Sequence, residues 1–217
     1  MAIAFDTTSQ KTASGWTSGS PVTWSHTCSG SNRLLVVCFA VGDSGSDIVS
    51  GVTYNGVAMT RVRFATYATG TRANYMYYLV APATGANNIT VTHSGSSFCH
   101  GNAVSYTGAS QTGQPDSSNN GSANTATSLG VATTVVAANS WVVGIFTNSS
   151  ANTNSHTNIT ARSDNPTIGI DIGDSNGAVA AGSYTMTEGG SGTGNWGAIV
   201  ASFSPAATVN SGFLAFM

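Results

Sequence analysis

Charge is the property that this sequence has least of. Aspartate, glutamate, lysine and arginine make up 6% of the 217 residues, and the formal net charge is -2, whereas an ordinary soluble domain is about 25% charged. Lys11 and Glu188 are the only lysine and the only glutamate. Binding to DNA or RNA depends on clustered basic residues that displace counterions from phosphates. Because the chain has no such cluster, we expect no nucleic-acid partner.

Long apolar runs and an export signal are also lacking. No stretch of about 18 apolar residues occurs, so the sequence predicts no membrane-spanning segment and no membrane partner. The opening MAIAFDTTSQ has neither a basic region nor a long apolar run, so it does not fit a secretory signal. We expect a chain that is made and folded in a cytoplasm, wherever it is finally located.

Cysteine is scarce as well. Three cysteines, Cys28, Cys38 and Cys99, do not make a disulfide framework, because the number is odd. If residues 21–27 and 33–42 form a hairpin, Cys28 and Cys38 lie too far apart to bridge. We expect free and mostly buried thiols.

Short β-rich runs, separated by clusters of glycine, serine, asparagine and proline, fill the chain, and helical periodicity is nearly absent. This spacing is typical of antiparallel sandwiches and barrels. We therefore predict an all-β fold, an antiparallel and jelly-roll-like β-sandwich with essentially no helix. The expected strands are residues 2–7, 21–27, 33–42, 48–54, 57–67, 72–81, 87–93, 98–107, 125–135, 140–148, 157–162, 167–172, 178–187 and 196–204.

Two local patterns are clearer than the rest. Asn55-Gly56, inside SGVTYNGVAMTRV, lies between two β-rich runs and predicts a type I′ hairpin turn, which needs positive φ at both central residues. Leu34–Val41 and Trp141–Phe146 are apolar at successive positions, without the alternation of a half-exposed strand. They predict central strands that are covered on both faces.

A weak internal repeat divides the chain. NRLLVVCF begins at Asn32 and matches the pattern of NSWVVGIF, which begins at Asn139. Either each half contributes strands to both sheets of one sandwich, or the halves form two small sandwiches. We expect the first arrangement, because a half of this size would have a thin core. The expected organisation is a single domain over 1–205, with halves 1–108 and 125–205, a loop over 109–124, and an apolar tail over 206–217.

Metal and cofactor signals are sparse. Asp171, Asp174 and Asn176 in DIGDSNG are candidate oxygen ligands for Ca²⁺. The segment lacks the EF-hand spacing, and Asp and Asn also form turns without metal, so we expect a turn. GTGNWG, residues 192–197, matches G-x-G-x-x-G, but a glycine-rich loop precedes it and a strand-like run follows it. We expect a turn there as well, and no cofactor.

Catalytic motifs are missing. The four histidines fit no zinc-ligand spacing, and we expect His93 and His100 to form a polar surface pair. G-x-S-x-G is absent. The eight acidic residues lie mostly in apparent turns and do not give the placed pair that glycoside hydrolysis requires. The sequence therefore predicts a protein that is not an enzyme.

Two apolar features lie outside the expected strands. Trp16, in the polar segment ASGWTSGS, is the candidate exposed aromatic for contact with a ligand such as a glycan. Phe213, Leu214, Phe216 and Met217 give the C-terminal NSGFLAFM an apolar tip. A free apolar tail promotes aggregation, so we expect it to pack on its own domain or, preferentially, at an interface with a neighbouring subunit.

Several segments together resemble a loosely defined β-sandwich domain family. They are VSGVTYNGVAMTRV, YYLVAPATGANNITVT, AVSYTGASQTGQP and GDSNGAVAAGS, and the resemblance extends from about Trp24 to Pro205. Members of this family occur in bacteriophage structural proteins and in large bacterial surface proteins. The resemblance implies a β-sandwich that serves display or assembly, and it carries over no catalytic residue and no ligand.

From this resemblance we expect a virion structural protein, specifically a capsid decoration or cement protein. It would be a homo-oligomer, with a trimer expected from the class, and would contact capsid or other virion proteins. The shortage of lysines on strand edges is consistent with edges that partners cover. The alternative is a glycan-binding adhesin module of a phage fibre or cell surface, with the loops and Trp16 as ligand contacts.

Overall fold

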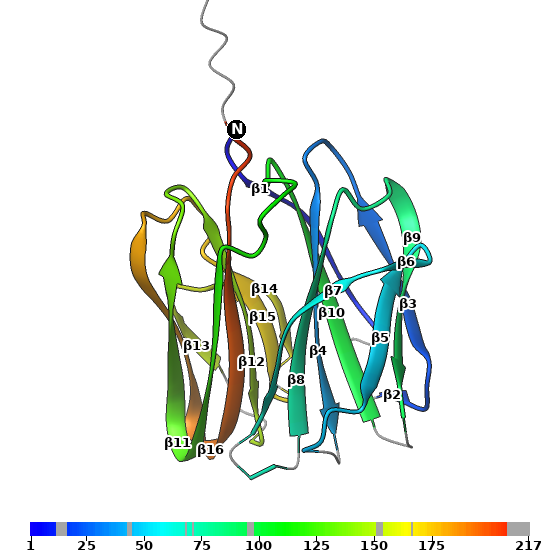
Figure 1. The fold of residues 1–217 in the computed structure, drawn as a ribbon. Coiled ribbons are helices and arrows are strands. Elements are labelled where there is room, and N and C mark those ends of the chain that lie inside the picture. The colour runs from blue at the N-terminus through cyan, green and yellow to red at the C-terminus, as the bar shows by residue number, and fades with distance from the viewer. Residues whose placement is uncertain are drawn as a thin grey trace, which may run out of the picture.

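The computed structural model describes residues 1–11, 17–42, 45–67, 69–70, 72–94, 98–150, 154–165 and 167–207. Trp16 and the four apolar residues of the C-terminal tail lie outside the described residues. The described chain is all-β and built from antiparallel strands in a sandwich arrangement, as predicted (Figure 1). None of it forms a helix with the length and apolar character that crossing a bilayer requires.

The strands of the described residues form three hydrogen-bonded sheets. The first has the order β3-β9-β5-β6, with bounds Val22–Cys28, Gly85–His93, Val49–Tyr54 and Val57–Ala58. The second has the order β1-β10-β4-β8-β7, with bounds Ala4–Gln10, Phe98–Thr107, Leu34–Gly42, Arg72–Val80 and Thr60–Thr66, and β2 (Thr17–Ser18) pairs with β10. The third has the order β11-β16-β12-β15-β14, with bounds Ser117–Val135, Gly182–Phe203, Trp141–Asn148, Ile170–Asp174 and Thr160–Asn165, and β13 (Asn154–Thr157) pairs with β16.

The third sheet folds over on itself because β11 and β16 are long. They pair from Ser117 opposite Ser202 to Val135 opposite Gly182, with register shifts between Ala123 and Ser128. Within β11, the Ser117 hydroxyl lies 2.9 Å from the Thr133 hydroxyl, so the two halves of this strand face each other. Apolar residues of the folded-over part pack on β12 and on the second half of β16. The folded-over part of β11 and β16 therefore forms a fourth layer of the molecule.

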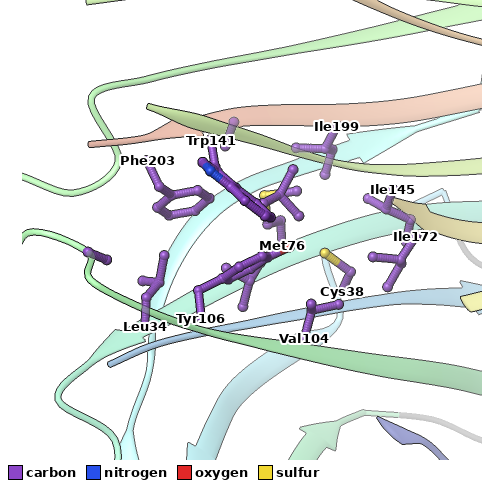
Figure 2. Packing of buried hydrophobic residues seen from close by; sticks show 14 of the residues in the cluster. Leu34, Cys38, Met76, Val104, Tyr106, Trp141, Ile145, Ile172, Ile199 and Phe203 are labelled. Atoms are coloured by element: carbon purple, nitrogen blue, oxygen red, sulfur yellow. The ribbon is translucent and has the colours of Figure 1, made fainter. Parts of the chain in front are cut away.

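The second and third sheets stack face to face and enclose a core of buried apolar residues. Figure 2 shows side chains of β4, β8 and β10 meeting those of β12, β15 and β16. Every residue of β4 and of β12 is buried, which confirms that both are central strands covered on both faces. A second core lies between the first and second sheets. The labelled members of the first core are Leu34, Cys38, Met76, Val104, Tyr106, Trp141, Ile145, Ile172, Ile199 and Phe203.

Each sheet takes its strands from one half of the chain. We expected both halves to share the two sheets of one sandwich; instead, the first half forms two layers, the second half forms two, and the inner layers stack. The order β1-β10-β4-β8-β7 corresponds to the order β11-β16-β12-β15-β14. A half of this size would have only a thin core if it stood alone. In this structure the inner sheet of each half covers the inner sheet of the other, which gives both a larger core.

The stacking of the two halves is reciprocal. Strand β1 lies beside β14, and β7 lies beside β11. Between the first pair, the Gln10 amide donates a hydrogen bond to the Ser163 hydroxyl. Between the second pair, Arg63 donates to the Ser118 carbonyl oxygen at 2.8 Å and to the Asn120 side-chain oxygen at 3.0 Å. Since β1 and β11 hold equivalent places, as do β7 and β14, the two contacts are equivalent, as in a two-fold arrangement.

The predicted hairpin is confirmed. Asn55 and Gly56 have φ values of 49° and 76°, and Tyr54 pairs with Val57. The three cysteines are free and buried, as expected. The hairpin considered for residues 21–27 and 33–42 does not form, because β3 and β4 belong to different sheets.

Two other expectations about strand limits differ from the structure. Strand β11 begins at Ser117, inside the expected loop 109–124, and β16 is one strand that includes GTGNWG, which is therefore not a turn. The second half of β16 is buried, and one of its two edges is hydrogen-bonded to β12. The backbone groups along its other edge also need partners, because unpaired buried peptide groups are costly. The polar first half of β11 supplies them.

Candidate functional site

The structure places the candidate calcium ligands in two different environments. Asp174 is fully buried, and its carboxylate accepts hydrogen bonds from Arg162 at 2.7 and 2.9 Å and from the Tyr106 hydroxyl at 2.8 Å. Arg162 also donates to the side-chain oxygen of Asn176 at 2.7 Å. The guanidinium therefore neutralises Asp174 and occupies the oxygens that a calcium ion would use. Asp171 belongs to another group of side chains.

That second group is a cluster of one histidine and three carboxylates, namely His156, Asp164, Asp171 and Glu188. Two cross-strand pairs create it: His156 stands opposite Glu188 on β13 and β16, and Asp164 stands opposite Asp171 on β14 and β15. Nε2 of His156 lies 3.8 Å from Oδ2 of Asp171. One ligand atom from each of His156, Asp164 and Asp171 lies within 4.8 Å of the others. The fold thus gathers four side chains that are distant in sequence.

Burial differs sharply within the cluster. Asp171 and Glu188 are each 2% exposed. The His156 side chain is 18% exposed, and Asp164, on the edge strand β14, is exposed. The cluster is therefore closed on the side of Asp171 and Glu188 and reaches solvent at Asp164.

The electrostatics of the cluster favour neutral carboxyl groups. Burial is the largest cause that raises the pKa of Asp171, and the adjacent carboxylates of Glu188 and Asp164 raise it further. Burial also raises the pKa of Glu188, and Asp164 adds to this, although a hydrogen bond with Asp171 acts in the opposite direction. The backbone N–H of Asn165 donates to Oδ1 of Asp171 at 2.9 Å. Two buried carboxyl groups thus share a site in which both cannot be charged without a compensating cation.

The cluster has more acceptors than donors. Oε2 of Glu188 and Nε2 of His156 are buried atoms with no hydrogen-bond partner among the described residues. Buried polar atoms are normally paired, so such an atom calls for an explanation. An imidazole nitrogen and carboxylate oxygens at close range can hold a proton or bind a cation.

Sequence reasoning found only one member of this cluster, Asp171. The signal that it missed is the position of Glu188 on its strand. Residues two apart on a strand share a face, and Glu188 follows the fully buried Met186 by two residues. A lone glutamate at a position that faces the core is the pattern that would have identified the site. His93 and His100, expected at the surface, are both buried.

A second feature lies at the end of the molecule where the described chain finishes. The N-terminal ammonium of Met1 donates to the carbonyl oxygen of Ala206 at 3.0 Å, so the first and last described segments lie side by side (Figure 1). They border a mostly apolar hollow of about 380 Å³. Its lining residues are Met1, Ala2, Asn139, Ala178, Pro205, Ala206 and Ala207.

The fold places this chain in the class of antiparallel β-sandwich proteins. Among known proteins, no family model and no curated sequence matches it.

Proposed function

We propose that this protein is a virion structural protein that decorates or cements a bacteriophage capsid. The apolar hollow between Met1 and Ala207 is the observation that carries the proposal. It lies at the end from which the chain continues into residues 208–217, whose sequence contains Phe213, Leu214, Phe216 and Met217. Apolar surface and apolar sequence at one end of a polar molecule favour anchoring through that end.

The body of the molecule suits passive display. Two sandwiches stacked through a continuous core make a rigid unit, and charged residues are few. A surface of serine, threonine, asparagine and glycine responds little to salt, because there are few charges to screen. Such a unit can present the same face over a range of ionic conditions. The sequence resemblance to phage structural proteins points in the same direction.

In this proposal the apolar end of the chain makes contacts with neighbouring copies of the same chain as well as with the capsid. The apolar tip of one copy would occupy the hollow of a neighbour, which gives a homo-oligomer, with a trimer as the expectation from the class. The site is small, so its occupation adds to further subunit contacts rather than replacing them.

Deletion of residues 210–217 tests this proposal. We expect the deletion to weaken the assembly, so that analytical ultracentrifugation shows monomers at concentrations at which the parent chain is oligomeric, and to reduce co-sedimentation with purified capsids that lack this protein. Val57→Ser is the matched control, since Val57 is 54% exposed on β6 in the first half of the chain and its loss also removes apolar surface. An unchanged assembly and unchanged capsid binding after the deletion would contradict the proposal.

A glycan-binding module is the second candidate. A polar hollow of about 430 Å³ lies on the first sheet beside the Asn55-Gly56 turn. Amide and hydroxyl groups from Thr53, Asn87, Asn88 and Thr90 line it, and such groups are suited to sugar hydroxyls. Binding on a glycan array that Asn88→Ala removes, without any affinity for capsids, would favour this alternative.

A further inference from the structure

The cluster of His156, Asp164, Asp171 and Glu188 has the composition of a metal site. It combines one imidazole nitrogen with carboxylate oxygens from three other side chains. The ligand atoms of His156, Asp164 and Asp171 already lie within 4.8 Å of one another. Ligand atoms around a tetrahedral Zn²⁺ are about 3.4 Å apart, given bonds of about 2.0–2.2 Å. Small side-chain rotations are enough to close this difference.

Glu188 gives independent support for a ligand. It is 2% exposed, stands opposite His156 in the pairing of β13 with β16, and keeps one oxygen, Oε2, without a hydrogen-bond partner among the described residues. Glu188 also forms no ion pair with an arginine or lysine of the described chain. A buried carboxylate in this position is unfavourable unless a cation compensates it.

The hydrogen bonds around the cluster direct specific atoms toward its centre. Oδ1 of Asp171 accepts the Asn165 N–H, which orients the carboxylate as outer partners do for metal ligands. Oδ2 is the atom that lies near Nε2 of His156, and that nitrogen has no hydrogen-bond partner among the described residues. The imidazole nitrogen therefore faces the carboxylate across a gap in which an ion can bind both.

We propose that His156, Asp164, Asp171 and Glu188 bind a first-row divalent cation, with Zn²⁺ as the best fit. A nitrogen ligand and four donors suit Zn²⁺, whereas Ca²⁺ takes six to eight oxygens. Four protein ligands leave no open position, so the site is structural rather than catalytic. The ion would tie β13 and β16 to β14 and β15. It would therefore hold the folded-over layer of the second half against its inner sheet.

Metal binding can be measured on the purified chain. After treatment with EDTA and removal of the chelator, ZnCl₂ is titrated at pH 7.5 and followed by calorimetry and by thermal unfolding. At free Zn²⁺ 100-fold above Kd, we expect the melting temperature to rise by about 5–10 °C. CaCl₂ and MgCl₂ should give no comparable rise. Substitution by Co²⁺ should give the intense visible absorption of a tetrahedral site.

Two variants locate the site without endangering the fold. His156→Ala and Asp164→Asn alter side chains that reach solvent, and each should weaken Zn²⁺ binding by 10-fold or more. Asp47→Asn is the matched control, because Asp47 lies in the other half and is partly exposed. It should bind Zn²⁺ like the parent chain.

Three results would overturn the proposal: no Zn²⁺ binding by the parent chain, equal binding by His156→Ala, or an equal response to Ca²⁺. This inference is independent of the proposed capsid role, since it is tested on the isolated chain.

Discussion

The metal-free chain should lose stability as the pH rises, and Glu188 is the residue that tests this. Its carboxyl group is buried beside Asp171, with His156 opposite it on β13. The carboxylate of Asp164 and the hydroxyl of Tyr67 also interact electrostatically with this carboxyl group. Burial raises the pKa of Glu188 from 4.5 to about 7. The substitution Glu188→Gln keeps the shape of the side chain and removes the titration.

The sign follows from proton binding. Between about pH 4.5 and pH 7 the folded chain keeps a proton on Glu188 that the unfolded chain has lost, so the free energy of unfolding falls as the pH rises through this window. A pKa unit corresponds to 1.36 kcal/mol, so the full loss is about 3 kcal/mol. For a chain of this size that is about 6–12 °C in melting temperature. The loss is complete above the folded-state pKa.

Thermal unfolding followed by circular dichroism at pH 5, 6, 7 and 8, with EDTA present, measures the effect. The buried His26 contributes an opposite slope, because burial lowers its pKa to about 4 and its stability contribution grows between about pH 4 and pH 6.5. This slope is common to both chains and cancels in their difference. The stability of the Glu188→Gln chain relative to the parent should increase from pH 5 to about pH 7 and level off by pH 8. A difference that stays constant over this range refutes the reasoning.

Two further substitutions test the polar links and the turn. Arg162→Met leaves the fully buried Asp174 without its cation and should lower the free energy of unfolding by about 3–5 kcal/mol in urea titrations; a loss below 1 kcal/mol would mean that the Tyr106 hydroxyl and the Asn176 N–H satisfy the carboxylate. Gly56→Val should cost about 1–2 kcal/mol, since Gly56 has a φ of 76° and no atom of the described residues lies within 4 Å of an added Cβ, so that the backbone conformation is what opposes the change. Gly51→Ala, equally open but without a positive φ, is its control and should cost less than half as much.

The sequence predicted the strands well where the signal is local. The apolar runs of β4 and β12 and the Asn55-Gly56 turn depend on neighbouring residues, and their predictions are confirmed. The first half of β11 was not predicted, because serine, asparagine and glycine have low strand propensity. Its pairing is dictated by the needs of β16, a strand about eighty residues away in the chain. The glycines of GTGNWG likewise lie where β16 crosses between layers, and their pattern resembles a turn.

The candidate site could not be predicted for a related reason. His156 and Glu188 meet because β13 pairs with β16, and Asp164 and Asp171 meet because β14 pairs with β15. No spacing in the sequence encodes how these two pairs come together, because their approach depends on the folding-over of the third sheet. Asp171 was considered with Asp174 because they are neighbours in sequence. The three-residue separation places them on opposite faces of β15, and Asp174 contacts Tyr106 of the other half.

The reciprocal contacts of β1 with β14 and of β7 with β11 bear on the history of this chain. In a dimer with a two-fold axis, each contact between two subunits occurs twice with the roles exchanged. The two halves meet under this rule although one backbone joins them. Duplication and fusion of the gene for a single-sandwich dimer would produce such an arrangement, in which residues 108–116 connect the two halves. The faint repeat between NRLLVVCF and NSWVVGIF falls on β4 and β12, which hold equivalent places in their sheets.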